Sequence, residues 1–350
     1  MSDIAKRKSD HLDLAARADI GFRQTTTLFE CVKLVHDALP ELDTAAIDLG
    51  TVVFGKRLAA PILIASMTGG TARAGEINRR LAAIVEERGY AIGLGSQRAM
   101  LRDPALGSTY SVRDVAPSAL ILANLGVVQA AELPTQAVFD LVGAVGADAL
   151  CLHLNPAQEL VQPEGDRDFR RGLETFERLS AELSVPVVAK ETGCGLSARA
   201  GRKLASAGVR HVDVSGAGGT SWVAIETERA EGRGRKIGTA FREWGIPTAA
   251  SIAAVTSIGF ETVFATGGLA TGLDLAKALA LGATAGGFAR PVLKALELGD
   301  AQARELLEQI EAELAVACAL CGVPRPRDLG TVPRVVVGEL KDWIEQASTA

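Results

Sequence analysis

The sequence predicts an α/β protein with one (β/α)8 barrel, the TIM barrel, extended by an N-terminal arm and a C-terminal helical segment. Three observations support this fold class. Eight short apolar segments recur along the 350 residues, amphipathic segments lie between them, and polar or glycine residues follow the apolar segments. Such barrels typically have about 250 residues and can exceed about 400, so this chain can hold one barrel with extensions.

The eight apolar segments are bounded by Gly and Pro, which is typical of strands buried on both faces of a parallel sheet. They span residues 60–65, 90–94, 119–123, 149–153, 185–189, 211–214, 261–265 and 284–288. The clearest amphipathic segments predict helices at 74–88, 135–145, 167–183, 198–207 and 271–281. Strands that alternate with helices indicate βαβ units, and eight units suggest a closed barrel.

The chain shows no Ser/Gly linker and no low-complexity tract, so we expect a single domain. Residues 1–59 form an arm or cap, residues 60–300 the barrel, and residues 301–350 a helical extension. The longest insertion, residues 215–246, follows the sixth strand and contains the polar, glycine-rich sequence TERAEGRGRK. It is either a mobile lid over the site or a solvated loop of mixed charge, and the sequence leaves both open.

Composition limits the partners and the compartment. The net charge is −5 and no long run of Lys and Arg occurs, which argues against nucleic acid as a partner. No apolar stretch of about 18 residues indicates a membrane span, and the N-terminus lacks the apolar region of a secretory signal. Five cysteines in such a chain suggest reduced thiols in the cytoplasm.

Polar residues gather where the predicted strands end. These segments are residues 66–70, 95–98, 124–126, 153–159, 190–191, 215–220, 266–268 and 289–290. Any one of them could be ordinary turn chemistry. Barrel enzymes carry their active sites at the C-terminal ends of the strands, so the eight segments together predict an active site there.

Two glycine-rich segments indicate a phosphate site. Gly267 and Gly268 open a predicted helix, and Gly286-Gly287 lead through the last strand to Arg290. Barrels often bind phosphate with the loops after strands seven and eight, through backbone N–H groups and a helix N-terminus. Glycine allows the backbone to approach the anion closely. A pair of tight turns is the alternative, and we favour phosphate.

Three further side chains are candidates for cofactor or metal binding. Lys190 ends an apolar strand and should project into the barrel mouth, either paired with Glu191 or as a fixed cation beside a cofactor that gains negative charge on reduction. We favour the second role. Met67 is placed to contact a cofactor ring through its thioether. Glu159, in HLNPAQE, is a sufficient protein ligand for Mg²⁺ beside a diphosphate, since Mg²⁺ usually takes one or two carboxylates; a surface glutamate is the alternative.

Four other residues are expected to be structural. Cys318 and Cys321 form a CxxC pair without a second pair, so we expect two small apolar residues on a helix rather than a zinc site. His36 and His211 stand alone, and we expect structural roles for both.

The motifs together resemble type II isopentenyl-diphosphate delta-isomerase, over nearly the whole chain. HLNPAQE at 153–159 and DVSGAGGTSW at 213–222 are the specific ones. The others are RKSDH at 7–11, PILIASMTGG at 61–70, GLGSQR at 93–98, NLG at 124–126, AKETGCGLS at 189–197, TGGLATGLDLAKALALGA at 266–283 and FARP at 288–291. Many FMN barrels share something like the stretch at 266–283.

This resemblance implies an FMN barrel that interconverts isopentenyl and dimethylallyl diphosphate in isoprenoid biosynthesis, with reduced flavin, Mg²⁺ and NADPH as the reductant. It implies FMN contacts from Ala65, Ser66, Met67, Thr68, Ser96, Asn124, Lys190, Ser215, Thr220, Gly267, Gly268, Ala289 and Arg290. It implies substrate contacts from Arg7, Lys8, Ser96, Gln97, Arg98, His153, Asn155 and Gln158, and Mg²⁺ on Glu159.

The resemblance also bears on catalysis and assembly. Lys190 would stabilise the anionic reduced flavin, and Gln158 would assist proton transfer. The family's arm serves a neighbouring subunit, which implies a homo-oligomer, a tetramer or octamer, with shared sites. One departure concerns the flavin phosphate, because Leu269-Ala270 follow the glycines where the family often has an Arg. The phosphate would then depend more on backbone N–H groups and Arg290.

Three rival functions fit the sequence less well. Two of them need a residue that the sequence lacks, and the third does not explain a residue that is present. An FMN-dependent α-hydroxy-acid oxidase or dehydrogenase needs a His base near the ends of strands six and seven, and residues 215–220 contain no histidine. An inosinate-type dehydrogenase needs a nucleophilic Cys after strand six, and residues 215–246 contain none. A non-catalytic flavin-binding protein would not need the carboxylate of HLNPAQE.

Overall fold

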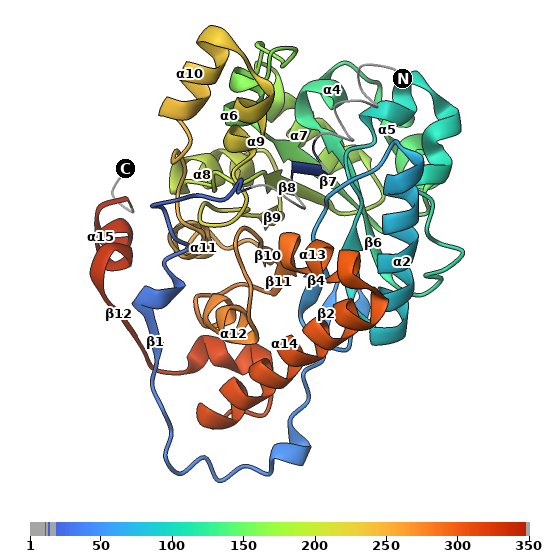
Figure 1. Ribbon diagram of the computed structural model, residues 1–350. Helices are drawn as coiled ribbons and strands as arrows, with labels where there is room; N and C mark the ends of the chain where they lie inside the picture. Colours follow the sequence, from blue (N-terminus) through green and yellow to red (C-terminus); the bar gives the residue numbers. More distant parts are fainter. Residues whose placement is uncertain (1–10, 12, 15–18, 348–350) are drawn as a thin grey trace.

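Eight parallel strands form a closed barrel, which confirms the predicted fold class. The computed structural model describes residues 11, 13–14 and 19–347. Around the barrel the strands follow the order β10-β11-β4-β5-β6-β7-β8-β9, so every strand neighbours the next one in the chain (Figure 1). The strands are β4 (Ile62–Ile64), β5 (Ala91–Gly93), β6 (Leu120–Gly126), β7 (Ala149–Leu154), β8 (Val187–Glu191), β9 (His211–Asp213), β10 (Thr262–Ala265) and β11 (Ala285–Phe288).

The predicted helices lie between these strands, with bounds close to those expected. Their ends follow local signals: Thr71 caps α2 by accepting from the Ala74 N–H at 3.2 Å, and Gly89, with φ 68°, ends it. The helices that surround the barrel are α2 (Ala72–Arg88), α4 (Val127–Ala131), α5 (Thr135–Ala144), α7 (Gly172–Glu182), α8 (Ala198–Ser206), α11 (Thr248–Thr256), α12 (Gly272–Ala280) and α13 (Arg290–Leu298).

Two segments differ from the pattern that the sequence predicts. The helix expected at 167–183 begins only at Gly172, because Arg171 adopts a left-handed backbone with φ 68° that a helix cannot continue through. Between β5 and β6 there is no long helix; the short α3 (Arg98–Arg102) and the 3₁₀ helix η3 (Pro104–Thr109) take its place.

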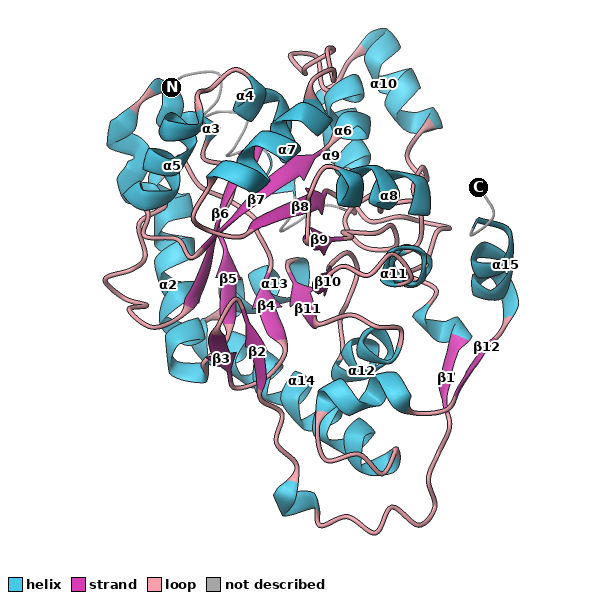
Figure 2. Cartoon of the chain, turned by 180° about the vertical axis from the view of Figure 1, so that it is seen from behind, coloured by secondary structure: helices cyan, strands magenta, loops and turns pink. Residues whose placement is uncertain are grey.

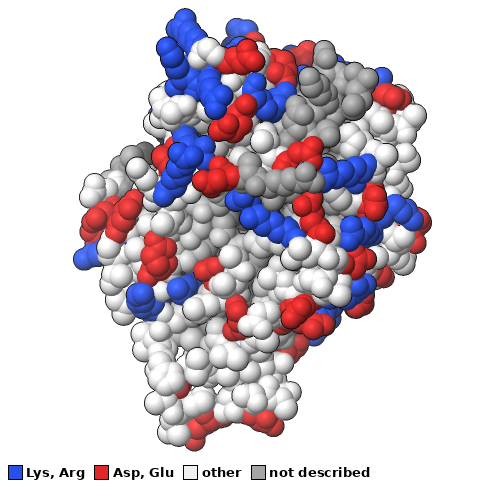
Figure 3. Space-filling view, in the orientation of Figure 1, with Lys and Arg blue, Asp and Glu red and all other residues white. Residues whose placement is uncertain are grey.

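The insertion at 215–246 is largely helical, which corrects the expectation of a loop. It contains α9 (Trp222–Arg229) and α10 (Gly232–Ala240), which pack against each other and against α6 (Pro156–Val161). Ser221 caps α9 by accepting from the Ala224 N–H at 3.1 Å. The outer side of α10 carries exposed Arg233, Arg235 and Lys236, and Lys and Arg gather there in Figure 3. The polar composition therefore marks a solvated helix face.

A hairpin closes the amino-terminal end of the barrel. It consists of β2 (Thr51–Val53) and β3 (Lys56–Leu58), whose Val53 and Leu58 belong to the same buried cluster as the inward side chains of the barrel, such as Leu122. At the hairpin turn the Phe54 ring lies 4.9 Å from the ring of His211, centroid to centroid. Apolar packing therefore fills this end, and polar groups are left to the opposite end.

The two extensions meet beside the barrel. The root of the arm, β1 (Val32–Leu34), pairs antiparallel with β12 (Arg334–Val336), and α14 (Asp300–Leu320) packs on α12 and α13 (Figure 2). Helix α15 (Gly338–Ala347) ends the described chain. Across the described residues, none of the helices combines the length and the apolar character that crossing a bilayer requires.

Candidate active site

A cavity of about 700 Å³ opens at the carboxyl ends of the barrel strands. This lies within the range of about 300–1,000 Å³ usual for small-molecule sites. Of the predicted site residues that the structure describes, all but Gln97 line it: Ala65, Ser66, Met67, Thr68, Ser96, Arg98, Asn124, His153, Asn155, Gln158, Glu159, Lys190, Ser215, Thr220, Gly267, Gly268, Ala289 and Arg290. Arg7 and Lys8 lie outside the described residues.

Gln97 is the one described candidate that does not line the cavity, and its substrate contact stays a prediction. Its side chain is fully buried; the amide donates to the Leu141 carbonyl at 3.2 Å and accepts from the Asn124 N–H at 3.0 Å. Gln97 therefore holds the end of β6 in place behind the site. Its neighbours Ser96 and Arg98 face the cavity instead.

One end of the cavity is formed by glycine-rich loops. Gly267 and Gly268 both have positive φ, 101° and 83°, a conformation that favours glycine. A Cβ on Gly267 would lie 2.2 Å from the Gly216 carbonyl oxygen, and one on Gly268 would lie 2.5 Å from Thr27 Cγ2. Only glycine allows these loops to pack this closely while their backbone borders the cavity.

The helix that can receive an anion at this end is α13. Its N-cap, Ala289, supplies no side-chain cap, and Arg290 follows at the first position of the helix. The helix after the glycine pair begins only at Gly272, and its N-terminus is already satisfied by a capping box between Thr271 and Asp274. A phosphate held on a helix N-terminus would therefore lie at α13 rather than at the helix after the glycine pair. This donor set fits a phosphate.

Lys190 lines the cavity, and its ionic partner is Asp213 rather than Glu191, the partner that the sequence suggested for a salt bridge. Its Nζ lies 2.8 Å from Asp213 Oδ2 and donates to the Glu191 backbone carbonyl at 3.1 Å. The Glu191 carboxylate instead accepts backbone N–H groups, including that of Thr192 at 2.6 Å. Strand register explains the pairing, because Lys190 of β8 is aligned with Asp213 of β9.

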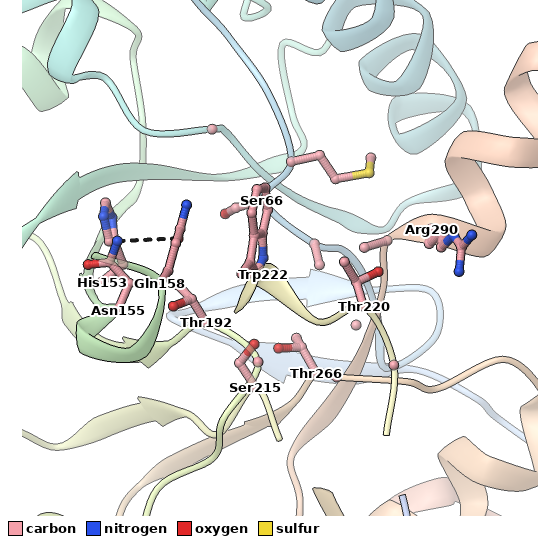
Figure 4. Close-up of a pocket in the computed structure, with 18 of the residues that line it drawn as sticks. Ser66, His153, Asn155, Gln158, Thr192, Ser215, Thr220, Trp222, Thr266 and Arg290 are labelled. Carbon is pink, nitrogen blue, oxygen red and sulfur yellow. Dashed lines mark hydrogen bonds between the residues drawn. The ribbon is translucent and has the colours of Figure 1, made fainter. Parts of the chain in front are cut away.

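Polar side chains from β7 and α6 form the other end of the cavity. Pro156 begins α6 at its first helical position and places Gln158 and Glu159 on the first turn. Asn155 Nδ2 donates to Glu159 Oε1 at 2.8 Å, and His153 Nδ1 lies 2.8 Å from Asn124 Oδ1. Figure 4 shows His153, Asn155 and Gln158 on one side of Trp222 and Ser66, and Thr220 and Arg290 on the other.

Glu159 has the environment of a held carboxylate rather than of a surface residue. It is 6% exposed, and its second oxygen accepts the Asp166 N–H at 2.8 Å. An ionised carboxylate accepts about four hydrogen bonds or ligands, so capacity for a cation remains. Within the described residues no group of three or more His, Cys, Asp or Glu could hold a metal. An ion on Glu159 would complete its shell with phosphate oxygens and water, as Mg²⁺ commonly does.

The described part of the arm also borders the cavity. The sequence had indicated contacts of the arm only at Arg7 and Lys8. His11, Gly21 and Phe22 are among the lining residues. The Phe22 N–H donates to the Gly219 carbonyl at 3.2 Å, so the arm runs along the glycine loop after β9. His11 Nε2 lies 2.8 Å from Glu226 Oε1, and its ring stands edge-on to Trp222 with centroids 5.3 Å apart.

Glu226 on α9 connects the arm to the predicted catalytic residue Gln158, and sequence reasoning missed it. It is fully buried, and its Oε1 accepts from Gln158 Nε2 at 3.2 Å. Burial opposes its ionisation, but the hydrogen bond from His11 and the charges of His11 and Arg229 hold its pKa below the usual value. The available signal was its position four residues after Trp222 of the DVSGAGGTSW motif, which places both on one helix face.

Comparisons with known proteins first define a class. Residues 154–334 match the family model for FMN-dependent dehydrogenases. Among solved structures, a mandelate oxidase mutant with a monooxide FMN adduct superposes with a TM-score of 0.64 at 18% identity, covering 93% of this chain and 95% of that one. A lactate oxidase of Pediococcus acidilactici gives 0.68 at 16%, covering 96% and 94%. These structures support the barrel fold.

Sequence relatives then give the family. The isopentenyl-diphosphate delta-isomerase of Halobacterium salinarum is 46% identical, covering 98% of this chain and 97% of the relative. Those of a Synechococcus species and of Methanopyrus kandleri are 48% and 42% identical, covering 89% and 98% of this chain and 90% and 94% of theirs. The chain belongs to the isopentenyl-diphosphate delta-isomerase family.

Proposed function

We propose that this chain interconverts isopentenyl and dimethylallyl diphosphate by an allylic shift of the double bond, with reduced FMN and Mg²⁺, in isoprenoid biosynthesis in the cytoplasm. NADPH is the proposed reductant. One observation carries the proposal: a single cavity joins a glycine-lined anion site at Arg290 to a second polar end at Asn155, Gln158 and Glu159. Two phosphorylated molecules, a cofactor and a substrate, suit these two ends.

The glycine-lined end would hold the FMN phosphate. Backbone N–H groups near Gly268, the N-terminus of α13 and the Arg290 guanidinium offer the donors. Lys190, which also lines the cavity, would place a fixed positive charge beside the flavin ring. When bound and reduced, the flavin would supply a ring nitrogen able to give and take a proton, a group that the neutral Gln158 cannot replace.

The opposite end would hold the diphosphate and its cation. His153, Asn155 and Arg98 line it, and Arg is suited to bidentate phosphate contacts. Arg98 now lies 3.4 Å from Asp166 Oδ2, a weak contact that a phosphate can replace. Glu159 would bind Mg²⁺, and Asn155 orients its carboxylate.

Gln158 would be oriented by its neighbours rather than free to rotate. Its Nε2 donates to Glu226 and its Oε1 accepts from Asn155 Nδ2 at 3.3 Å. These two bonds fix which side of the amide faces the cavity. A fixed amide beside the hydrocarbon part of the substrate would help to direct proton transfer.

We also propose a homo-oligomer, a tetramer or octamer, in which arms serve neighbouring subunits. In the described chain His11 contacts Glu226 of its own barrel. The same contact can form between the arm of one subunit and the barrel of the next, since exchanging an identical element between protomers leaves the contacts unchanged.

The test of the function is an assay under controlled redox conditions. Purified protein loaded with FMN should isomerise isopentenyl diphosphate only after anaerobic reduction and only with Mg²⁺, while NADPH consumption stays far below turnover. Turnover with fully oxidised FMN and no reductant would contradict the mechanism. Absence of FMN binding in equilibrium dialysis would remove the proposal altogether. Flavin reduction by lactate or mandelate would favour the hydroxy-acid oxidase alternative.

A further inference from the structure

Behind Lys190 lies a buried carboxylate, Asp213, to which no role has been assigned. Asp213 ends β9 and is 2% exposed, and Lys190 is 6% exposed. Asp213 does not line the cavity itself, so the ammonium of Lys190 stands between the carboxylate and any molecule in the cavity. A pair buried to this degree is little screened by solvent.

The pair is held by hydrogen bonds on all sides. Thr266 Oγ1 donates to Asp213 Oδ1 at 2.6 Å, and the Ser215 N–H donates to the same oxygen at 3.2 Å. Lys190 donates to the Glu191 carbonyl and, at 3.4 Å, to Thr266 Oγ1 in addition to its contact with Asp213. All three ammonium protons therefore have protein acceptors, which restrain the ammonium group at the cavity wall.

Asp213 also stabilises the turn at which the β9 loop enters the cavity. Ser215, a lining residue, has a positive φ of 37°, which is uncommon for a residue other than glycine. The bond from its N–H to Asp213 helps to hold this conformation. One carboxylate thus fixes two residues of the cavity wall.

The charge of Asp213 has a second effect, on the field at the cavity. Lys190 alone would present a full positive charge, but together with Asp213 the pair has no net charge. An anion in the cavity is therefore attracted less than by Lys190 alone, and the difference is large where the dielectric constant is low. The oxidised flavin ring is neutral and feels this difference less than an anionic reduced ring does.

We propose that Asp213 is a positioning residue that fixes Lys190 and sets how strongly the cavity prefers anionic reduced flavin over oxidised flavin. This inference rests on the proposed binding of FMN. Asp213 holds the reduction potential of the bound flavin below the value that Lys190 alone would give it. The proposal concerns no proton transfer and adds no catalytic group.

The test is a charge cycle of four proteins: wild type, Asp213→Asn, Lys190→Met and the double variant. For each, the dissociation constants of oxidised and reduced FMN and the midpoint potential of the bound flavin are measured anaerobically. Asp213→Asn should favour the reduced form by at least about tenfold, a positive shift of about 30 mV for a two-electron couple. Lys190→Met should shift the potential in the negative direction, and the double variant should lie near wild type.

Two controls separate charge from packing. Thr266→Val changes the cavity lining and removes the hydrogen bonds of Thr266 to Asp213 and Lys190 without changing the charge, and it should move the potential much less. Asp148→Asn breaks another Asp–Lys pair, with Lys56 at 2.8 Å, outside the cavity lining, and should leave the potential unchanged. The spectrum of the reduced flavin, anionic or neutral, is an independent readout that should become more anionic in Asp213→Asn.

The outcomes decide between this inference and the function beneath it. If wild type binds no FMN, the proposed function fails. If FMN binds and Asp213→Asn leaves its potential unchanged or lowers it, only this inference fails. Should Asp213→Asn not fold, because Lys190 is left buried without a counter-charge, the comparison of Lys190→Met with the double variant gives the same test. Removal of Asp213 must then still shift the potential in the positive direction.

Discussion

At the scale of single residues, the site depends on carboxylates that hydrogen bonds from neighbours hold in position. Glu159 is positioned by Asn155 and by the Asp166 N–H, while Glu226 joins Gln158 to the arm. Neither is simply an acidic residue in a cavity, because both are buried with specific donors. The sequence indicated Glu159 through its place after a strand end, whereas the only signal for Glu226 was its spacing from Trp222 in a glycine-rich segment of mixed charge.

Replacing Glu159 by Gln should separate metal binding from flavin binding. A neutral amide is a poor ligand for Mg²⁺, so the Mg²⁺ concentration for half-maximal activity should rise about tenfold or more, or turnover should disappear. FMN affinity, measured by fluorescence titration, should stay within about twofold because Glu159 lies at the far end of the cavity. Glu164→Gln, on an exposed neighbouring carboxylate, is the matched control. Unchanged activity at limiting Mg²⁺ would exclude Glu159 from the metal site.

Gln97 shows why residue assignments are harder than strand assignments. The motif GLGSQR placed Ser96, Gln97 and Arg98 together, and the sequence could not tell which of three consecutive side chains turns inward. In the structure Gln97 is buried, with hydrogen-bond partners on the backbone of Leu141 and Asn124, while Ser96 and Arg98 line the cavity. Polar residues next to a cavity often hold its wall rather than its ligand.

At the scale of elements, the hairpin β2–β3 explains stability at the amino-terminal end of the barrel. Leu58 is 2% exposed within the barrel cluster, whereas Val52 on the same hairpin is 60% exposed. Leu58→Ala should lower the free energy of unfolding by about 2–4 kcal/mol, from lost burial and the cavity left behind. Val52→Ala should change it by less than about 0.5 kcal/mol.

Urea denaturation of both variants measures the difference, and FMN affinity of the folded protein serves as the control. It should be unchanged in both, since the hairpin lies at the end of the barrel opposite to the cavity. Equal free energies of unfolding for the two variants would show that the buried Leu58 contributes no more to stability than the exposed Val52.

The barrel strands could be predicted from sequence because their apolar runs are continuous and carry little else. The insertion at 215–246 could not, because the buried face of α9 is short and is followed by a segment rich in charge and glycine. Tertiary packing against α6 stabilises α10 despite its three glycines. The first residues of 167–183 show the opposite error. Their apolar pattern predicted a helix, but the left-handed backbone at Arg171 is incompatible with one.

At the scale of the whole molecule, the open question is whose barrel an arm serves. We expect Arg7→Ala with Lys8→Ala to weaken substrate binding without releasing FMN. Mixing this variant with Glu159→Gln, after dissociation and reassembly, should raise activity above the sum of the separate proteins. Intact barrels of the first would then receive intact arms of the second.

Mass measurements on subunits of distinguishable mass must show that hybrids form. If hybrids form and activity stays at background, each arm serves its own barrel, as the contact between His11 and Glu226 within the described chain would then imply. A normal KM in the double-alanine variant would mean that the arm contributes nothing to substrate binding.

The hairpin β2–β3 also determines from which end small molecules can enter the cavity. Since apolar side chains fill that end, the cavity bounded by the described residues is reached from the carboxyl ends of the strands. Nicotinamide, oxygen, substrate and product would then all enter and leave through the same opening of the cavity. A diphosphate bound beside Glu159 would obstruct that opening, so each bound substrate would delay both the reduction of the flavin by NADPH and its oxidation by oxygen. The reduced flavin of a substrate-bound enzyme would therefore persist longer in air than that of the substrate-free enzyme.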